Sequence, residues 1–398
     1  MKIAIITPEY PPYISGGIGS YNYELVSKLT EKNLNVTVIT PSILRNEIKT
    51  FNAFHKCYYL KTPSLRPLYF YFQLYNRERI RKIIERDEPD ILQLNVDSYI
   101  LLKALKGFLK KIKLVLVFHG SPSPFNRQWD SLKHLDVPDT AWTMSLLTYS
   151  TIERAIGDDV FEYIDVAIHV SKHVMYYNLL CNEKLRSVRN VVIYPGVDVT
   201  QYVKYLNTTR KYSTTKNFRN FVFGARLMRY KGIVQLLRAF SLASEKNRRI
   251  ALHIFGDGPL ERYVLKFINS SKYAHRILYY DKVPRELFLK YLTAGDILVH
   301  PSFYESFGMV VIEAVLLNKP VIAHKAPWSE ELVKAFDIGI AIDVSNEEEF
   351  SETLLTMAND NNYAKMLRKL QDRRIELLRI FSSETMARNY VELYYKLV

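Results

Sequence analysis

Uninterrupted runs of apolar, largely β-branched residues recur along this chain, each about as long as one strand. Strands buried on one face alternate apolar and polar residues. Unbroken runs therefore indicate sheets covered by helices on both faces, as in parallel sheets. The runs form a first series at 2–7, 36–40, 91–94, 114–119, 166–170 and 191–194, and a second at 221–223, 251–255, 277–280, 297–300 and 320–323. We therefore predict an α/β protein with two doubly wound, Rossmann-like parallel sheets.

Two further features divide the chain into domains. The segment 203–220 is polar and without periodicity, which is typical of a connector. A last helix is predicted from Ser383, because apolar residues recur there at helical spacing: Met386, Tyr390, Leu393 and Tyr394. We expect an N-terminal domain over 1–198, a C-terminal domain over 199–380 and a separate final helix over 381–398.

Composition excludes several classes of protein. With 398 residues, of which 48% are hydrophobic and 24% charged, the chain is neither disordered, collagenous nor disulfide-stapled. Its two cysteines, Cys57 and Cys181, match no metal or redox spacing, which favours a reducing compartment. No apolar run approaches the roughly 20 residues of a membrane span, and the apolar start is too short for a signal sequence. We expect a cytoplasmic protein.

The net charge of +14 indicates an anionic partner, which could be nucleic acid, anionic lipid or a phosphorylated small molecule. Residues 199–244 contain nine Lys or Arg and no Asp or Glu. Such a run is either a solvated basic face or part of an anion-binding site.

Glycine is scarce and unevenly placed. Only 14 glycines occur, about half of the usual frequency of roughly 7%. Ten of them stand near the carboxyl end of a predicted strand or at the start of the next helix. Ligands of doubly wound sheets bind at that edge, although ordinary turns also use glycine there. In the first loop, Gly16 and Gly17 expose backbone N–H groups at a helix start, which suits an anion or sugar hydroxyls.

A histidine and two cations lie at the same predicted edges. His119 ends the strand 114–119, where contact with a ligand and a purely structural role are both possible. Arg226 stands in the turn after the strand 221–223, and Lys231 begins the next helix. Two cations beside free helix N–H groups suit a diphosphate and could replace a divalent metal, while the alternative is a solvated turn.

Two glutamates follow the strand 297–300. Glu305 stands in the loop, and Glu313 lies in a deeply apolar helix, where a carboxylate needs hydrogen-bond donors. Ribose hydroxyls could donate to Glu313 and sugar hydroxyls to Glu305, while a neighbouring Lys or Arg is the structural alternative. The first unpaired N–H groups of this helix belong to Phe307, Gly308 and Met309.

Together these residues resemble the retaining glycosyltransferases of the GT-B fold, specifically glycosyltransferase family 4. The family signature is a pair of glutamates separated by seven residues, here Glu305 and Glu313 within PSFYESFGMVVIEA. Supporting motifs stand in the family's order, namely GGIGSY, YPGVD, GARLMRYKG, FGDGP and NKPVIA.

The resemblance implies two Rossmann-like domains that face a central cleft, with the final helix packing back on the N-terminal, acceptor-binding domain. It implies that the C-terminal domain binds a UDP-, GDP- or ADP-linked sugar. Arg226 and Lys231 would hold the diphosphate and Glu313 the ribose. The other donor contacts implied are Glu305, Phe307, Gly308, Met309, Gly256 and Asp257.

The resemblance also implies the reaction. A hexose-type sugar moves to a hydroxyl of a glycan or lipid-linked acceptor with retention at the anomeric carbon, without a cofactor or a divalent metal. Gly16 and Gly17 would approach the phosphate and the acceptor, and His119 the transferred sugar. The catalytic group would comprise His119, Arg226, Lys231 and Glu305.

Other interpretations remain open. A nucleotide-sugar epimerase shares the two-domain plan. A nucleic-acid binder would use the basic run, but no recognition module is visible and we expect no nucleic-acid partner. The segment 65–82 sets aromatic residues beside arginines, which is typical either of a helix lying on anionic lipid or of a core helix with a solvated basic face. Peripheral contact with the inner face of the membrane is therefore an alternative to a freely cytoplasmic location.

Overall fold

The computed structural model describes residues 1–13, 16–65, 68–95, 99–120, 161–206 and 217–398. The described residues form two compact units. The first combines residues within 1–198 with Ile380–Val398, and the second is Val199–Arg379. The chain therefore enters the first unit twice, at its beginning and at its end.

The first unit is built on an eight-stranded sheet with the order β3-β4-β2-β1-β5-β6-β7-β8. All neighbouring pairs are parallel except β3 with β4. The strands are β1 (Lys2–Ile6), β2 (Asn35–Ser42), β3 (Glu47–Asn52), β4 (His55–Lys61), β5 (Ile91–Asn95), β6 (Lys113–Phe118), β7 (Val166–His169) and β8 (Arg189–Val192).

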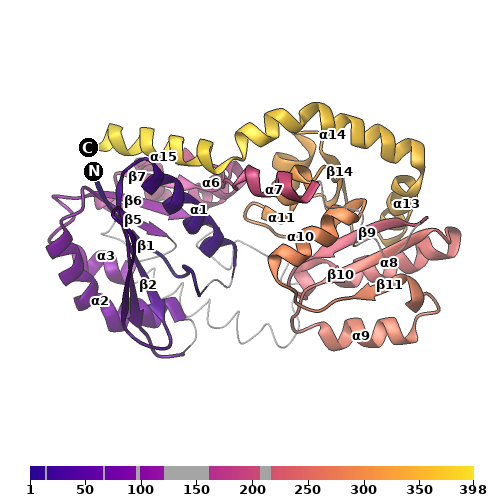
Figure 1. Cartoon of the computed structure of the whole chain (residues 1–398), viewed down its shortest axis with the longest axis horizontal. Helices are drawn as coiled ribbons and strands as arrows, with labels where there is room; N and C mark the ends of the chain where they lie inside the picture. Colours follow the sequence, from indigo (N-terminus) through magenta and orange to yellow (C-terminus); the bar gives the residue numbers. More distant parts are fainter. Residues whose placement is uncertain (14–15, 66–67, 96–98, 121–160, 207–216) are drawn as a thin grey trace. The chain divides into compact units, whose positions relative to one another are not determined.

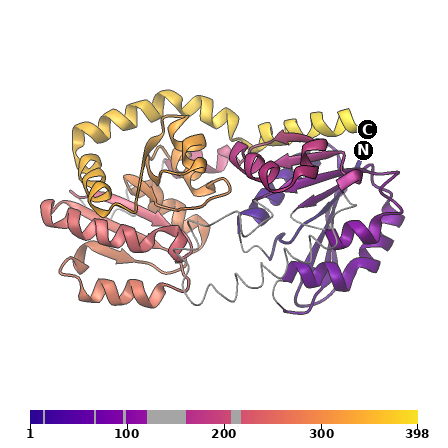
Figure 2. The same ribbon diagram turned by 180° about the vertical axis from the view of Figure 1, so that it is seen from behind.

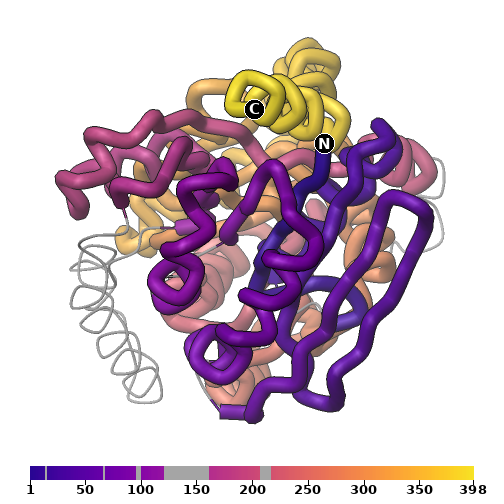
Figure 3. The backbone as a smooth tube through the Cα atoms, turned by 90° about the vertical axis from the view of Figure 1, so that its left-hand side faces the viewer, coloured from indigo at the N-terminus to yellow at the C-terminus, as the bar shows by residue number. Residues whose placement is uncertain are grey.

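Helices pack together around this sheet. Its α-helices are α1 (Gly17–Glu31), α2 (Leu68–Asp87), α3 (Tyr99–Leu105), α6 (Lys172–Cys181) and α15 (Ser383–Leu397), with short 3₁₀ turns η1 (Phe161–Tyr163) and η2 (Glu183–Ser187). The C-terminal helix α15 packs against the N-terminal helix α1 (Figures 1 and 3), and α2 packs against α3. The last helix predicted from Ser383 is confirmed, and its four predicted contact residues are buried.

The second unit is built on a six-stranded parallel sheet with the order β11-β10-β9-β12-β13-β14. The strands are β9 (Arg219–Gly224), β10 (Ile250–Phe255), β11 (Ile277–Tyr279), β12 (Ile297–His300), β13 (Val321–His324) and β14 (Gly339–Ile342). The helices and turns are α7 (Val199–Leu206), η3 (Arg229–Lys231), α8 (Ile233–Lys246), α9 (Glu261–Ser270), η4 (Ala274–Arg276), α10 (Arg285–Ala294), α11 (Met309–Leu316), α12 (Pro327–Ser329), the π-helical η5 (Glu330–Lys334), α13 (Glu347–Ala358) and α14 (Asp360–Ile380).

Two groups of helices pack in this unit. Helix α13 lies beside α8, as the reverse view shows in gold and salmon (Figure 2), while α7, α10 and α11 contact one another. The fold class predicted from unbroken apolar runs is confirmed, since both units carry parallel sheets and each predicted run corresponds to a strand.

The sequence prediction was incomplete at the sheet edges and wrong in the connector. Strands β3, β4 and β14 lie outside the predicted runs. Two of them were missed because β3 is a largely exposed edge strand and β14 is four residues long with a glycine. Within 203–220, the part predicted as irregular, α7 continues to Leu206 and β9 begins at Arg219. Helix α7 was missed because Tyr202 is its one buried residue.

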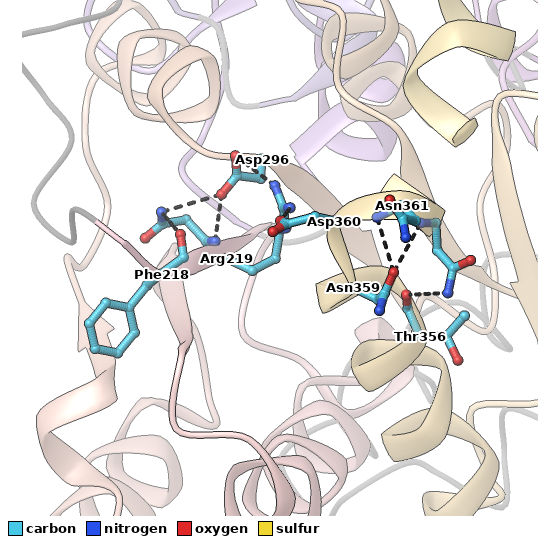
Figure 4. A network of polar contacts seen from close by, with 9 residues as sticks. Phe218, Arg219, Asp296, Thr356, Asn359, Asp360 and Asn361 are labelled. Atoms are coloured by element: carbon cyan, nitrogen blue, oxygen red, sulfur yellow. Dashed lines mark hydrogen bonds and ion pairs between the residues drawn. The ribbon is translucent and has the colours of Figure 1, made fainter. Parts of the chain in front are cut away.

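A charged network ties α14 to the amino edge of the second sheet (Figure 4). The guanidinium of Arg219 lies 3.4 Å from an Asp296 oxygen and 2.7 Å from an Asp360 oxygen. It also covers the Tyr363 ring, 3.8 Å from the ring centroid. Asp296 also accepts the Asn220 N–H at 2.7 Å. Because Asp360 is exposed, its ion pair contributes little. Asp296 therefore fixes the Arg219 guanidinium, and the packing of that group on the Tyr363 ring holds the start of α14.

In the first unit, the residues just before α7 lie against the residues at the start of α15. The Val197 N–H donates to the Phe381 carbonyl, and the Ser383 N–H donates to the Val197 carbonyl, each at 2.9 Å. A Cβ added at Gly196 would lie 2.4 Å from the Ser382 carbonyl oxygen. Glycine is therefore required at 196 by the close approach of the returning chain.

Four histidines are held neutral by the fold. Burial lowers the pKa of His119 to about 3 and the pKa values of His55, His169 and His253 to about 4. Burial disfavours the charged imidazolium, so these rings remain uncharged well below the ordinary histidine value of 6.5.

We predict that the free energy of unfolding falls as the pH falls from 7 to 5. Near pH 7 these histidines are largely neutral in both states. Below about 6.5 the unfolded chain binds protons that the folded protein excludes, so each further pH unit costs about 1.4 kcal/mol per histidine. Thermal unfolding at pH 7, 6 and 5 measures the slope. His253→Gln should reduce it, exposed His275→Gln should not, and a melting temperature independent of pH would contradict the prediction.

Candidate functional site

The loops after β9, β10 and β12 meet at the carboxyl edge of the second sheet. These strands are parallel neighbours, so their ends share one edge. The Leu227 N–H donates to the Asp257 carbonyl at 2.7 Å, and the Phe303 N–H donates to the Tyr230 carbonyl at 2.9 Å. The residues predicted at 226–231, 256–257 and 305–309 therefore stand on adjoining loops.

Glycines allow these loops to pack on one another. A Cβ at Gly232, where φ is 74°, would lie 2.2 Å from the Pro301 carbonyl oxygen. A Cβ at Gly256, where φ is 137°, would lie 2.0 Å from the Ala225 carbonyl oxygen. The close approach inferred from the sequence is, at these two positions, an approach of the chain's own backbone.

Lys231, His300 and Glu305 form a polar cluster between two of these loops. The Lys231 ammonium donates to Glu305 Oε1, and His300 Nε2 lies 2.7 Å from the same oxygen. His300 is 2% exposed, and the side chains of Lys231 and Glu305 are 15% and 16% exposed. The His300 ring packs edge-on against Trp328, and its Nδ1 has no hydrogen-bond partner among the described residues.

The charges of this cluster stabilise each other. Burial alone would raise the pKa of Glu305, but Lys231 and then His300 lower it well below its usual range. Burial likewise opposes the charge on Lys231, yet Glu305 more than compensates and raises the pKa of the ammonium. The cluster therefore holds an ionised carboxylate and an ammonium in one fixed place.

Arg226 stands apart from this cluster. It is exposed, and no hydrogen bond or ion pair joins its guanidinium to any described residue.

The start of α11 follows Glu305 closely in the sequence. Gly308 caps this helix with φ 85°, and the N–H groups of Gly308 and Met309 have no acceptor within the described parts of the chain. Phe307 is buried beneath them. An exposed cation and unused helix-start donors are therefore available to an anionic or hydroxylic ligand.

Glu313 is held by two donors from the protein itself. Arg285 Nε lies 2.9 Å from Glu313 Oε1, and its Nη2 lies 2.6 Å from the same oxygen. The Tyr202 hydroxyl donates to this oxygen at 3.3 Å and accepts from Arg285 at 2.6 Å. The neighbouring arginine, the structural alternative for a buried glutamate, is thus present. Glu313 Oε2 has no partner among the described residues.

At the start of α1, the predicted glycine site faces the chain's own carboxylate. Gly16 caps the helix and Gly17 is its first residue. Glu9 Oε2 accepts the Gly19 N–H at 3.3 Å and would lie 3.5 Å from a Cβ at Gly16, whereas a Cβ at Gly17 would meet nothing within 4 Å. Gly17 therefore borders open space, and any anion at this helix end meets Glu9.

His119 follows β6 and is held by neutral groups. Its Nε2 lies 3.0 Å from Asn95 Oδ1, and the Tyr21 ring of α1 packs edge-on against it with ring centroids 4.7 Å apart. With a pKa lowered by burial to about 3, the ring is uncharged at neutral pH. It can exchange hydrogen bonds with hydroxyl groups without carrying charge.

Three residues of these sites were missed from the sequence. His300 is the last residue of β12, and His119 directly follows β6. A histidine at the carboxyl end of a strand was therefore the signal that could have identified His300. Arg285 opens α10 after Pro284, but its pairing with a residue 28 positions later is not visible in a pattern. Tyr202 directly precedes the segment interpreted as a connector, and it lies on the undetected helix α7.

Two family models match the chain, one in each half. The family model "Glycosyltransferase Family 4" matches residues 15–201, and "Glycosyl transferases group 1" matches residues 207–374. An uncharacterized glycosyltransferase of Methanocaldococcus jannaschii is 22% identical over 99% of this chain and 98% of its own. The N-acetyl-alpha-D-glucosaminyl L-malate synthase of Bacillus anthracis is 21% identical over 99% of this chain and 97% of its own.

Solved structures share the fold. Sucrose-phosphate synthase from Thermosynechococcus elongatus superposes with a TM-score of 0.78 at 16% identity, over 100% of this chain and 98% of that one. Anabaena HepE in complex with UDP superposes with a TM-score of 0.70 at 16% identity, over 100% of both chains. With two parallel-sheet units of this architecture and a family match to each half, the chain belongs to the GT-B glycosyltransferases of family 4.

Proposed function

We propose that this glycosyltransferase moves a hexose-type sugar from a nucleoside-diphosphate sugar to a hydroxyl of a glycan or lipid-linked acceptor. Transfer proceeds with retention at the anomeric carbon and without a metal or other cofactor. The observation that carries the proposal is the cluster of Lys231, His300 and Glu305 beside the unpaired start of α11. Family membership favours transfer over the epimerase alternative.

The diphosphate binds Arg226 and Lys231. Because Arg226 has no polar contact with any described residue, it loses none when it binds an anion. Lys231 is fixed by Glu305, and an ammonium with three N–H donors can serve a phosphate oxygen as well as this carboxylate. Two protein cations supply the charge that a divalent metal supplies at other diphosphate sites, which supports a metal-independent reaction.

The carbohydrate parts of the donor bind carboxylates and amides. Glu313 Oε2, which has no described partner, accepts from the ribose hydroxyls, while Arg285 and Tyr202 hold the other oxygen. Glu305 and the N–H groups of Gly308 and Met309 bind the hydroxyls of the transferred sugar. Phe307, Gly256 and Asp257 complete the donor loops described above.

The transfer step exchanges two bonds at the anomeric carbon. The bond to the diphosphate oxygen breaks, the bond to the acceptor oxygen forms on the same face, and the acceptor's proton passes to the departing phosphate. Negative charge grows on the departing oxygen, so fixed cations there stabilise the transition state more than the ground state. Arg226 and Lys231 perform this role, and His119 and the Gly16–Gly17 turn contact the sugar and the acceptor.

Replacing Arg226 by alanine should lower kcat/KM for release of the nucleoside diphosphate by roughly 10- to 1000-fold, because a charged hydrogen bond to a developing anion is lost. The matched control is Arg248→Ala, an exposed arginine that precedes β10 at the opposite end of the strand. Equal activity of the two variants would remove Arg226 from the diphosphate site.

A nucleotide panel tests the donor site directly. UDP is tested first because a fold relative was solved with it, followed by GDP and ADP. The matching nucleotide at 100 times its Kd should stabilise the protein by about 2.7 kcal/mol. Glu313→Gln should weaken this shift through loss of the ribose contact, whereas Glu286→Gln, on the exposed face of α10, should keep it. An unchanged shift in Glu313→Gln would contradict the ribose role.

We also infer that helix α2 rests on an anionic membrane surface, which would suit a lipid-linked acceptor. The helix buries one face, yet Leu74 and Tyr75 are 41% and 61% exposed beside the exposed cations Arg77 and Arg79. No helix in the described residues is long and apolar enough to cross a bilayer. Exposed apolar side chains next to cations are typical of helices that lie in the lipid interface.

Co-sedimentation with vesicles tests this contact. The protein should pellet with anionic vesicles at physiological salt and less with zwitterionic ones. Leu74→Glu with Tyr75→Glu should abolish pelleting. The control pair Leu180→Glu with Tyr176→Glu changes residues that are 52% and 61% exposed on α6 and should not affect it. Equal pelleting of both double variants would contradict the role of α2.

A further inference from the structure

Helix α15 supplies a buried hydroxyl to the residues that hold His119. Tyr394 is fully buried, and its hydroxyl donates to Gln93 Oε1. Gln93 Nε2 lies 3.4 Å from Asn95 Oδ1, which lies 3.0 Å from His119 Nε2. Both amides are fully buried on β5. A chain of polar contacts therefore runs from the C-terminal helix through the sheet to the histidine.

The Tyr394 hydroxyl determines the orientation of both amides in this series of polar contacts and the position of the ring proton on His119. Tyr394 has no other hydrogen-bond partner within the described residues, so its proton is satisfied only by donation to Gln93. Gln93 then presents its NH2 group to Asn95, and Asn95 must present its oxygen. An oxygen facing His119 Nε2 requires that this nitrogen carries the ring proton.

The opposite arrangement is less stable. If both amides were turned over, Gln93 would donate to Tyr394, and the buried hydroxyl proton would have no described acceptor. Leaving a buried donor unpaired carries a free-energy penalty. The Asn95 NH2 group, which already lacks a described partner, would then face His119, and the ring proton would move to Nδ1.

A second tyrosine of α15 supports the same ring through Tyr21. The hydroxyl of Tyr390 is hydrogen-bonded to that of Tyr21, and both side chains are buried. The Tyr21 ring packs edge-on against His119 at an interplanar angle of 87°. The C-terminal helix thus limits both the orientation of the ring and the site of its proton.

We propose that Tyr394 and Tyr390 of α15 are positioning residues, which fix His119 as the neutral tautomer protonated at Nε2 and leave Nδ1 as its free acceptor. This inference rests on the proposed function for its effect on catalysis. Nδ1 has no described partner, so a hydroxyl of the bound sugar or acceptor can donate to it. A hydroxyl hydrogen-bonded in this way is oriented by the last helix of the chain.

The test measures the tautomer in the ligand-free, full-length protein labelled with ¹⁵N-histidine, with His119→Gln used to assign the signals. The wild type should show one neutral tautomer with the proton on Nε2. Tyr394→Phe should give averaged ring shifts of a mixture, and kcat should fall about 5- to 30-fold with little change in donor KM. Tyr395→Phe alters the neighbouring residue, which is 63% exposed, and should change neither.

Unchanged tautomer signals in Tyr394→Phe would overturn the proposal, and so would a mixed tautomer with an unchanged kcat. If Tyr394→Phe fails to fold, Gln93→Met breaks the same chain inside the sheet and should give the same mixture. Because the tautomer is read without substrate, an absence of sugar transfer in the wild type would count against the proposed function alone.

Discussion

Parallel pairing of β9 with both β10 and β12 decides where chemistry can occur in the second unit. Because the three strands run in one direction, their carboxyl ends and the loops that follow share one edge. Glycines at 232 and 256 let these loops pack in direct backbone contact. The result is that Lys231 and Glu305, 74 residues apart, meet as one ion pair.

The two glutamates of the family signature are held in the same way, through contacts to Oε1. Lys231 and His300 contact Oε1 of Glu305. Arg285 and Tyr202 contact Oε1 of Glu313. A buried carboxylate is stable only with such donors, and removing one donor leaves an uncompensated charge. These contacts hold the two carboxylates in place without a ligand. A ligand that binds them therefore loses less free energy to the ordering of their side chains.

The sequence allowed us to predict the fold class and the sheet edge at which the candidate site residues lie, because unbroken apolar runs and strand-end glycines are local patterns. It did not show which charged residues pair with each other. The contact of Arg285 with Glu313 depends on how α10 packs beside α11, and that of Lys231 with Glu305 on the order of β9 and β12 in the sheet. Helix α7 and strand β3 escaped detection for a different reason, since elements with few buried residues leave little apolar pattern.

The first unit is discontinuous in sequence, and this affects the order of its folding. Domains generally fold as the ribosome releases them, the N-terminal one first. Here, however, α15 is made after all of Val199–Arg379, and Tyr21 on α1 is covered by Tyr390 of that helix. During synthesis the nascent first unit therefore has an uncovered patch on α1 until α15 has been made. Helix α1 reaches its final packing only after α15, more than 350 residues later, has left the ribosome.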